Sequence, residues 1–322
     1  ATAQKPATSK EEGNLVVFSG PDFKATFDKQ SGLLTSYLYK KHEYILNGQG
    51  PRPFFWRAPT DNDYGANLPV RLKAWKEASY QEPKAESFQV TPGSNATTVK
   101  VTYRFPQTDA RWDITYKIYA SGIIKVDNRF VAEGDQAPMI PRVGLRMQLP
   151  ESFTDLTYYG RGPKENYRDR RTSQFIGEYA IPVKNMYEPY VRPQENNHRT
   201  DIYWCAFTDK TQRGLLLIAD RTFELNASNY PLESMDSGDT IDNGAPRTEK
   251  THHRHLTDPL PEKMIDLFID YRMMGVGGDD SWGATAHEPY LIRPGKENAI
   301  EYGFTLVPFD KKEDYKYLIR QY

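Results

Sequence analysis

Polar and apolar residues alternate along most of this chain, which is the pattern of β-strands that bury one face. Residues 99–105, 112–118 and 265–271 each place an aliphatic or aromatic side chain at every second position. Further short runs that fit strands span residues 14–18, 23–27, 33–39, 123–130, 143–149, 202–208, 214–219 and 299–307. Turn-forming pairs such as Ser31-Gly32 and Ser121-Gly122 separate these runs. The pattern predicts an all-β fold, a large antiparallel sandwich.

Helical periodicity is rare in this sequence. The best candidate helix spans residues 68–80, where Pro69 suits a first turn and Leu72 and Trp75 follow at helical spacing. A short helical piece also fits residues 248–255. Strands and helices do not alternate along the chain, so the pattern argues against a TIM barrel or a Rossmann domain here.

Composition and charge narrow the class of protein. The chain has 322 residues, of which 38% are hydrophobic, which is enough for a sizeable core. Its 42 Lys and Arg residues against 43 Asp and Glu residues leave a formal charge of -1, so charge gives no case for a nucleic-acid or membrane partner. The only cysteine, Cys205, lies in an apolar run, which excludes an internal disulfide and predicts a buried, inert thiol.

The two ends differ from the rest of the chain in composition. Residues 1–11 are polar, contain no apolar signal segment and are predicted to be a linker or tail. Residues 311–322 are charged and rich in tyrosine, and they are expected to form a C-terminal tail. The residues between them, 12–310, are expected to form one large domain.

Five segments are too polar and too rich in glycine for strands, and loops of this kind often carry functional residues. They span residues 54–65, 158–171, 187–199, 251–256 and 275–282. Their carboxylates include Asp61, Asp63, Glu165 and Glu195. Such groups could supply the acid and base of a glycosidase, or they could cap loops by accepting backbone N–H groups. The arginines of residues 158–171 are expected to pair with these acids.

The glycine-rich segment 275–282 reads GVGGDDSW. It lacks the Lys-Ser/Thr ending of a phosphate-binding loop. Two interpretations stay open. It is a wide strand connection whose glycines permit positive φ, or it is a tight loop that presents Trp282 for stacking on a sugar ring.

Three histidines lie close together in the sequence, at His252, His253 and His255. They lack an HExxH helix and a carboxylate at a standard metal-site spacing. Loop capping is therefore favoured over metal binding, and the sequence predicts no metal site.

The loops together carry a family resemblance. The motifs FWRAPTDNDYG, GRGPKENYRDR, MYEPYVRPQENNHR, THHRHL and GVGGDDSW occur in this order, within a match that covers roughly residues 12–308. This set resembles the C-terminal domain of family 2 glycoside hydrolases of the β-galactosidase type, and the small subunit of those that are split into two chains. The resemblance implies a large antiparallel β supersandwich similar to the galactose-mutarotase fold.

The resemblance also implies where the chemistry lies. The two catalytic glutamates are expected on a TIM barrel that precedes this region, and the Mg and Na sites on domains outside it. We therefore expect no catalytic residue, metal or cofactor in this chain. The partners implied are the preceding TIM-barrel and sandwich domains or large subunit, a galactoside substrate, and an oligomeric parent enzyme of the bacterial cytoplasm or periplasm.

The roles implied for this region concern one wall of the active-site cleft. Trp282 is the implied platform for the leaving glucose of lactose, supported by Gly277, Gly278, Asp279 and Asp280. A mobile loop near the active site is matched by Asp61, Asn62, Asp63, Tyr64 and Gly65, although the family often has isoleucine at the position of Tyr64. Further candidate cleft or loop-fixing residues are Arg57, Glu165, Asn166, Tyr167, Glu195, Asn196, Arg199, His253 and His255.

Three functions remain open at this point. The first is a substrate-lining, non-catalytic part of a β-galactosidase that hydrolyses terminal β-D-galactosides with retention. The second is a free-standing carbohydrate-binding module. The third is a mutarotase-like epimerase, but Asn197-His198-Arg199 departs from the epimerase pattern after the histidine. We also expect Phe54, Phe55 and Trp56 to form an exposed apolar face where the barrel would dock.

Overall fold

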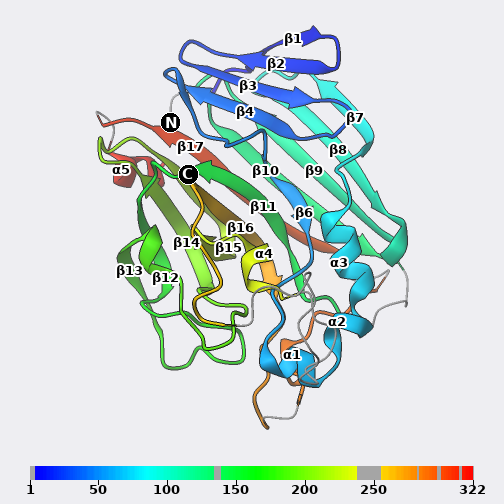
Figure 1. Cartoon of the computed structure of the whole chain (residues 1–322). Coiled ribbons are helices and arrows are strands. Elements are labelled where there is room, and N and C mark those ends of the chain that lie inside the picture. The colour runs from blue at the N-terminus through cyan, green and yellow to red at the C-terminus, as the bar shows by residue number, and fades with distance from the viewer. Residues whose placement is uncertain are drawn as a thin grey trace.

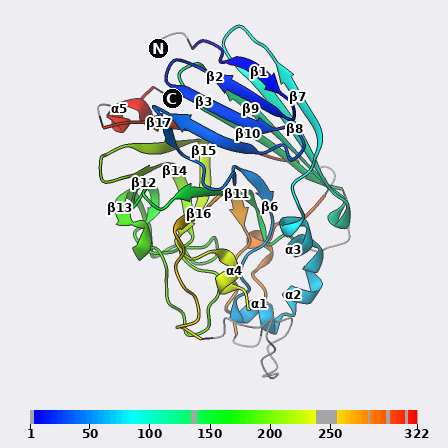
Figure 2. The same cartoon turned by 45° about the horizontal axis from the view of Figure 1, so that its top comes forward.

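Two antiparallel sheets make up this protein (Figure 1). The computed structural model describes residues 4–133, 139–237, 255–280, 283–295, 299–311 and 314–321. The smaller sheet has five strands, which pair in chain order: β1 (Thr8–Glu12), β2 (Leu15–Ser19), β3 (Phe23–Asp28), β4 (Leu34–Tyr39) and β5 (His42–Glu43). It lies over one end of the larger sheet (Figure 2).

The larger sheet has twelve strands and branches at one of them. Its strands are β6 (Arg52–Phe54), β7 (Ala85–Thr91), β8 (Thr97–Phe105), β9 (Ala110–Ile118), β10 (Ile124–Ala132), β11 (Arg142–Pro150), β12 (Asp155–Gly162), β13 (Phe175–Pro182), β14 (Arg199–Thr208), β15 (Gly214–Ser228), β16 (Met264–Met273) and β17 (Ile300–Phe309). The main path runs β13-β12-β14-β15-β17-β10-β9-β8-β7. The first part of β15, 214–219, pairs with β17, whereas residues 224–228 pair with β16, which leads on to β11 and β6. This branch curls the sheet around its own core and confirms the predicted all-β antiparallel class.

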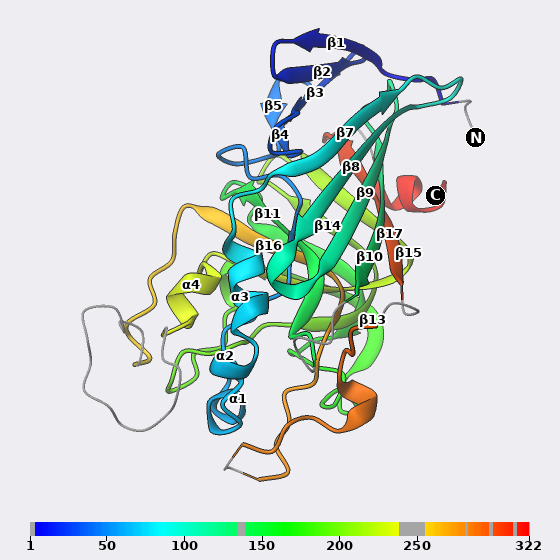
Figure 3. The same cartoon turned by 90° about the vertical axis from the view of Figure 1, so that its right-hand side faces the viewer.

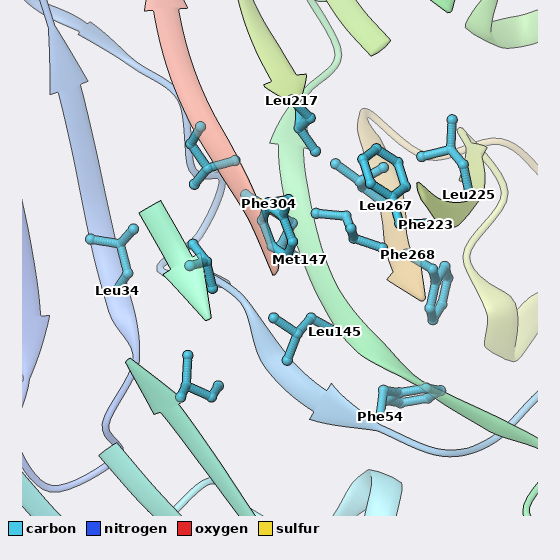
Figure 4. Packing of buried hydrophobic residues seen from close by; sticks show 14 of the residues in the cluster. Leu34, Phe54, Leu145, Met147, Leu217, Phe223, Leu225, Leu267, Phe268 and Phe304 are labelled. Carbon is cyan, nitrogen blue, oxygen red and sulfur yellow. The ribbon is translucent and has the colours of Figure 1, made fainter. Parts of the chain in front are cut away.

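The core lies between the branches of the larger sheet and beneath the smaller one. Figure 4 shows Leu145 and Met147 of β11 gathered with Leu217 of β15, Leu267 of β16 and Phe304 of β17. Rings join the two sheets, since Phe27 of β3 lies 5.0 Å from Tyr116 of β9 and 6.1 Å from Phe88 of β7 between ring centroids. These residues lie in the strand runs that the sequence predicts, except for Phe88, whose strand β7 was not predicted.

The helices are short and lie mostly at one end of the molecule (Figures 1 and 3). They are α1 (Asp61–Gly65), α2 (Leu68–Arg71), α3 (Lys73–Tyr80), α4 (Leu232–Met235) and α5 (Tyr315–Ile319), with 3-10 turns at Pro106–Thr108, Val183–Asn185 and Glu288–Tyr290. The helix predicted over residues 68–80 is present as α2 and α3, which meet at Leu72. The helical piece considered at 248–255 lies outside the described residues, apart from His255.

The aromatic run Phe54–Trp56 is not the exposed docking face that we expected. The exposed fractions of Phe54, Phe55 and Trp56 are 1%, 0% and 2%. Phe55 packs against Trp75 of α3 at 5.1 Å and against Phe105 of β8 at 4.9 Å between ring centroids. The prediction is wrong because other parts of the chain already cover these rings: β8–β10 and α3 cover Phe55, Phe268 of β16 and Tyr80 of α3 cover Phe54, and Lys76 of α3 lies over Trp56.

Both ends of the chain contain ordered elements that the sequence analysis did not assign. The segment 1–11 was expected to be a linker, but Thr8–Glu12 forms β1 and pairs with β2. In the predicted tail 311–322, α5 packs against the outer face of the larger sheet, where Tyr315 lies near Trp204 and Phe309. Both segments therefore extend the domain at its edges.

Candidate functional site

Four of the five polar loops meet at one end of the molecule, around α1. In Figure 1, α1 and the orange segment that follows β16 lie together at the lower end of the view. The loops that lead out of β12 and into β14 contact the same end, as the following hydrogen bonds show. The fifth loop, residues 251–256, is described only from His255 onward.

Helix α1 begins with a capping box. The Thr60 hydroxyl accepts a hydrogen bond from the Asp63 N–H at 3.1 Å, and the Asp63 carboxylate accepts one from the Thr60 N–H at 3.0 Å. Each group satisfies a backbone donor that the helix itself leaves open. Asp63 therefore sets the position where α1 starts.

Arg57 joins α1 to the glycine-rich loop. Its guanidinium donates to both Asp63 oxygens at 3.0 and 2.8 Å, and to the carbonyls of Met274 at 2.8 Å and Gly275 at 3.1 Å. The exposed fraction of Arg57 is 2% and that of Asp63 is 5%. A buried, bidentate ion pair of this kind fixes geometry because neither charge has water as an alternative partner.

The glycine-rich loop is also held from the β12–β13 connection. The Asp169 carboxylate accepts hydrogen bonds from the N–H of Val276 at 3.0 Å and of Gly277 at 2.8 Å. Gly277 and Gly278 have φ values of 75° and 124°, which only glycine adopts readily. These observations describe a loop that is fixed by hydrogen bonds and turns at glycines of positive φ, which is compatible with both interpretations of residues 275–282.

The loop returns across α1. A Cβ on Gly283 would lie 2.2 Å from the backbone carbon of Gly65, so the two segments touch through their main chains. The Asn62 amide lies 3.0 Å from the Gly278 N–H and 3.2 Å from the Asp280 carbonyl. Ser281 and Trp282, the implied platform residue, lie outside the described residues.

Two aspartates follow the glycines in this loop. The Asp279 carboxylate pairs with His287, and the Asp280 carboxylate accepts the Ala284 N–H at 3.1 Å. The Asp279 hydrogen bond and charge raise the pKa of His287 above its ordinary value. Each of these two contacts joins a residue before position 281 to a residue after position 282.

The loop of residues 187–199 covers the opposite side of α1. Gln194 exchanges hydrogen bonds with Asp61, and the Arg192 guanidinium lies 3.8 Å from the centroid of the Tyr64 ring. Tyr64 is buried, and its hydroxyl lies 2.8 Å from that of Ser237. The buried Tyr64 hydroxyl therefore ties α1 to Ser237.

The candidate acids in the neighbouring loops accept hydrogen bonds from other groups of the protein. Glu165 accepts hydrogen bonds from Arg170 at 2.7 Å, from the Tyr190 hydroxyl and from the Asn197 N–H at 2.8 Å. The Glu195 carboxylate accepts from the Asn226 amide at 2.8 Å. Of the four arginines in 158–171, only Arg170 pairs with one of the expected acids.

The remaining candidate residues make hydrogen bonds and ring contacts that join the loops near the start of β14. Asn166 donates to the carbonyls of Arg161 and Lys164 and accepts from Thr200, whereas Asn196 donates to the Gln194 carbonyl. The Arg199 guanidinium donates to the Tyr158 hydroxyl at 3.2 Å and to two loop carbonyls. The Tyr167 ring stacks on His198, with ring centroids 5.3 Å apart. His253 lies outside the described residues, and His255 is exposed with its N–H donated to Asp258.

A buried polar network lies beneath these loops, and most of it was missed from the sequence. His198 contacts Asn226 at 2.6 Å and Glu224 at 3.0 Å, and the Arg142 guanidinium lies 3.2 Å from Asp270. All five side chains are 5% exposed or less. The alternation in residues 265–271 predicts a polar, solvent-facing side that includes Asp266 and Asp270; this is wrong, because β16 is buried on both faces.

Burial and mutual contact shift the pKa values in this network. Burial opposes the charged forms of His198 and Glu224, but their hydrogen bond and attraction outweigh it, so the pKa of His198 is raised and that of Glu224 is lowered. Burial raises the pKa of Asp270 to about 7, although Arg142 acts in the opposite direction. The network therefore holds a His–Glu ion pair together with an acid that ionises near neutrality.

We expect this network to make the protein less stable in alkaline solution. The stabilisation from protonated His198 is complete below its unfolded pKa of 6.5 and is lost as pH rises through its higher native pKa. Asp270 acts in the same direction, because between pH 3.8 and about 7 its carboxyl is already ionised in the unfolded chain but still protonated in the native state. The Glu224 contribution is lost only in acid, below its unfolded value of 4.5.

The measurement is the free energy of unfolding in urea at pH 5.5 and pH 8.5. We expect a lower value at pH 8.5, with a smaller difference in His198→Gln. His255→Gln, at an exposed histidine, is the matched control and should keep the full difference. An equal pH dependence in His198→Gln and the unaltered chain would contradict the assignment of this effect to the ion pair.

Three further features concern metal binding, the cysteine and membrane-spanning segments. Among the described residues, no group of three or more His, Cys, Asp or Glu side chains could hold a metal ion. Cys205 is fully buried, and burial raises the pKa of its thiol. No helix within the described part of the chain is both long and apolar enough to cross a bilayer.

The fold and the site together define a curled β-supersandwich with a loop-built site at one end. Galactose 1-epimerase from Lactobacillus acidophilus is similar in structure, with a TM-score of 0.51 at 6% identity over 94% of this chain and 98% of that one. This similarity shows the shared galactose-mutarotase type of fold.

A family model described as the β-galactosidase small chain matches residues 19–306, and the chain belongs to this family. Similar curated proteins are the β-galactosidases of Priestia megaterium, 33% identical over 90% of this chain, and of Lactobacillus delbrueckii subsp. bulgaricus, 32% identical over 85%. The chain spans only 26% and 25% of these two relatives, so it corresponds to a small part of a larger protein.

Proposed function

We propose that this chain forms one wall of the substrate site of a β-galactosidase and contributes no catalytic residue. The observation that supports this role is the meeting of four separate loops around α1, with the segment on either side of Trp282 held by Asp169, Asn62 and Arg57. A site of this kind places a side chain precisely without supplying acid–base chemistry. The parent reaction is the hydrolysis of terminal β-D-galactosides, such as lactose, with retention.

The contacts of the carboxylates in the loops support the assignment of catalysis to another part of the protein. A retaining glycosidase needs two carboxyl groups about 5 Å apart that are free to act as acid and nucleophile. Asp63, Glu165 and Glu195 instead accept hydrogen bonds from backbone, arginine or amide groups. Following the family resemblance, we assign the catalytic glutamates, Mg and Na to the TIM-barrel and sandwich domains or large subunit, and we expect an oligomeric parent.

Trp282 is the residue whose removal tests this proposal. In the complete enzyme, Trp282→Ala should weaken inhibition by glucose about tenfold or more, because stacking on a sugar face contributes roughly 1–2 kcal/mol. Inhibition by galactose should change less, and Trp282→Phe should retain part of the stacking. This chain alone should show no turnover of a chromogenic β-galactoside above background.

Two outcomes would contradict the proposal. Turnover that copurifies with this chain would place catalytic carboxylates inside it, with Glu165 and Glu195 the first to test. A large loss of stability in Trp282→Ala with unchanged glucose inhibition would make Trp282 a core residue, because a truncated core tryptophan costs roughly 3–5 kcal/mol.

A further inference from the structure

A second pocket lies on another part of the surface, between β6, β11, α3 and the residues around α4. Its volume is about 380 Å³, which is within the usual range for a small bound molecule. The polar residues that the argument uses are Gln49, Arg52, Tyr80, Gln148 and Glu262. None of them belongs to the loops of the site described above.

Tyr80 gives this pocket a fixed aromatic wall. Its exposed fraction is 38%, and it lies in the last turn of α3. The ring packs edge-on against Phe54 at 5.5 Å between centroids, and the Arg146 guanidinium lies 5.1 Å from the centroid of Phe54. Because the ring is supported from behind, it can stack on a ligand with little loss of side-chain entropy.

The polar groups around Tyr80 keep hydrogen-bonding capacity. Arg52 donates two bonds, to the carbonyls of Ser79 at 2.8 Å and Gln81 at 2.9 Å, both through Nη2. Within the described part of the chain, no carboxylate pairs with Arg52, and the side chains of Gln49, Gln148 and Glu262 make no hydrogen bond. Donors and acceptors are thus both present at the pocket wall, as vicinal hydroxyl groups require.

Charge in the pocket disfavours an anionic ligand. Arg146 is neutralised by two acids, since it donates to Glu233 at 2.6 and 2.8 Å and to Asp266 at 2.7 and 2.8 Å. Among the described residues that line the pocket, Arg52 is the one further cation; Glu262 lines the same pocket, and the nearby Glu82 also acts on the Arg52 charge. A pocket with this balance attracts neither a phosphate nor an acidic sugar, because no excess positive charge remains.

We propose that this pocket binds a neutral saccharide unit, separately from the substrate site. Tyr80 stacks on the apolar face of the sugar ring, Arg52 and the two glutamine amides donate to its hydroxyl groups, and Glu262 accepts from them. The proposal does not rest on β-galactosidase activity, because it requires neither the four loops nor a catalytic group.

The test is a titration of this chain with lactose, galactose and galacturonate, in which saturation-transfer NMR of the ligand signals measures binding. We expect millimolar binding of lactose and galactose and much weaker binding of galacturonate. The double variant Gln148→Ala/Glu262→Ala should lower the affinity for lactose at least about fivefold, through two lost hydrogen bonds. Tyr80→Ala should lower the affinity for lactose by a similar factor. The unfolding curve of this variant shows whether it is still folded.

Two control variants locate the binding. Glu301→Ala, at an exposed glutamate of β17, should leave the lactose affinity unchanged. Asn62→Ala, which disturbs the four-loop site, should also leave it unchanged. Absence of lactose binding, an unchanged affinity in the double variant, a loss caused by Asn62→Ala alone, or equal binding of galacturonate would each overturn the proposal.

Discussion

Replacing Arg57 by methionine is expected to lower the free energy of unfolding by about 3–5 kcal/mol, the usual cost of removing one partner of a buried ion pair. The variant leaves the Asp63 carboxylate without its guanidinium and the carbonyls of Met274 and Gly275 without their donor. Methionine fills a similar volume, so the loss reflects unpaired polar groups rather than a cavity. Urea unfolding measures this change.

The control for Arg57 is an arginine that also contacts both oxygens of one carboxylate, but at the exposed surface. Arg104 donates to both oxygens of Glu86 at 3.1 Å, and the two side chains are 46% and 50% exposed. Arg104→Met should cost less than about 1 kcal/mol, because water replaces the lost partner. The double variant Arg57→Met/Asp63→Leu should be more stable than Arg57→Met alone, since the unpaired buried carboxylate of Asp63 is then removed as well.

The Arg57 variant also tests the coupling between α1 and the glycine-rich loop. Arg57 is bonded to both segments, so hydrogen exchange should increase at the amides of α1 and at Val276 and Gly277 together. A loss below about 1 kcal/mol, with exchange unchanged in the loop, would contradict the role assigned to this ion pair.

The strands of the core were predictable from the sequence, because one physical pattern specifies them. Residues 99–105 and 112–118 fall within β8 and β9, and their alternating residues are the ones that the structure buries. The alternating pattern did not predict burial correctly for strands that bury neither face or both faces. Strand β13 is exposed or half-buried throughout, and β16 is buried on both faces.

The candidate site was predictable in its parts but not in its geometry. The loops stand out in the sequence by their glycine, asparagine and charged residues, and the resemblance marks them further. Their contacts depend on how far-apart strands are paired, as with Asp169 and Gly277, which lie 108 residues apart. A lone aspartate in an arginine-rich loop offers no sequence signal for that partner. Buried acids on strands, such as Glu224 and Asp270, do offer one, because a charge inside a strand of apolar residues needs a partner.

Gly144→Ala is expected to lower the free energy of unfolding by about 3 kcal/mol or more, at the upper end of the cost of overpacking a core. Gly144 lies in β11 at a register shift opposite β16, and a Cβ there would be 1.7 Å from an Asp270 carboxylate oxygen and 2.9 Å from the Asp270 Cα. The side-chain oxygen cannot move away freely, because Arg142 lies 3.2 Å from the same carboxylate and the surroundings are fully buried. The methyl group therefore displaces either the strand or the partner of Arg142.

Gly177→Ala is the matched control for this substitution, because it also adds a methyl group to a strand glycine. The three atoms nearest to its Cβ would all belong to the Tyr179 side chain, at 3.1–3.3 Å, in the edge strand β13. The stability should change by no more than about 1 kcal/mol, since the ring can turn aside and alanine restricts the unfolded chain. Thermal and urea unfolding of the two variants give the comparison. If Gly144→Ala and Gly177→Ala were equally stable, strands β11 and β16 would be able to move apart to admit the methyl group. The absence of a side chain at residue 144 would then not be required for the position of Asp270.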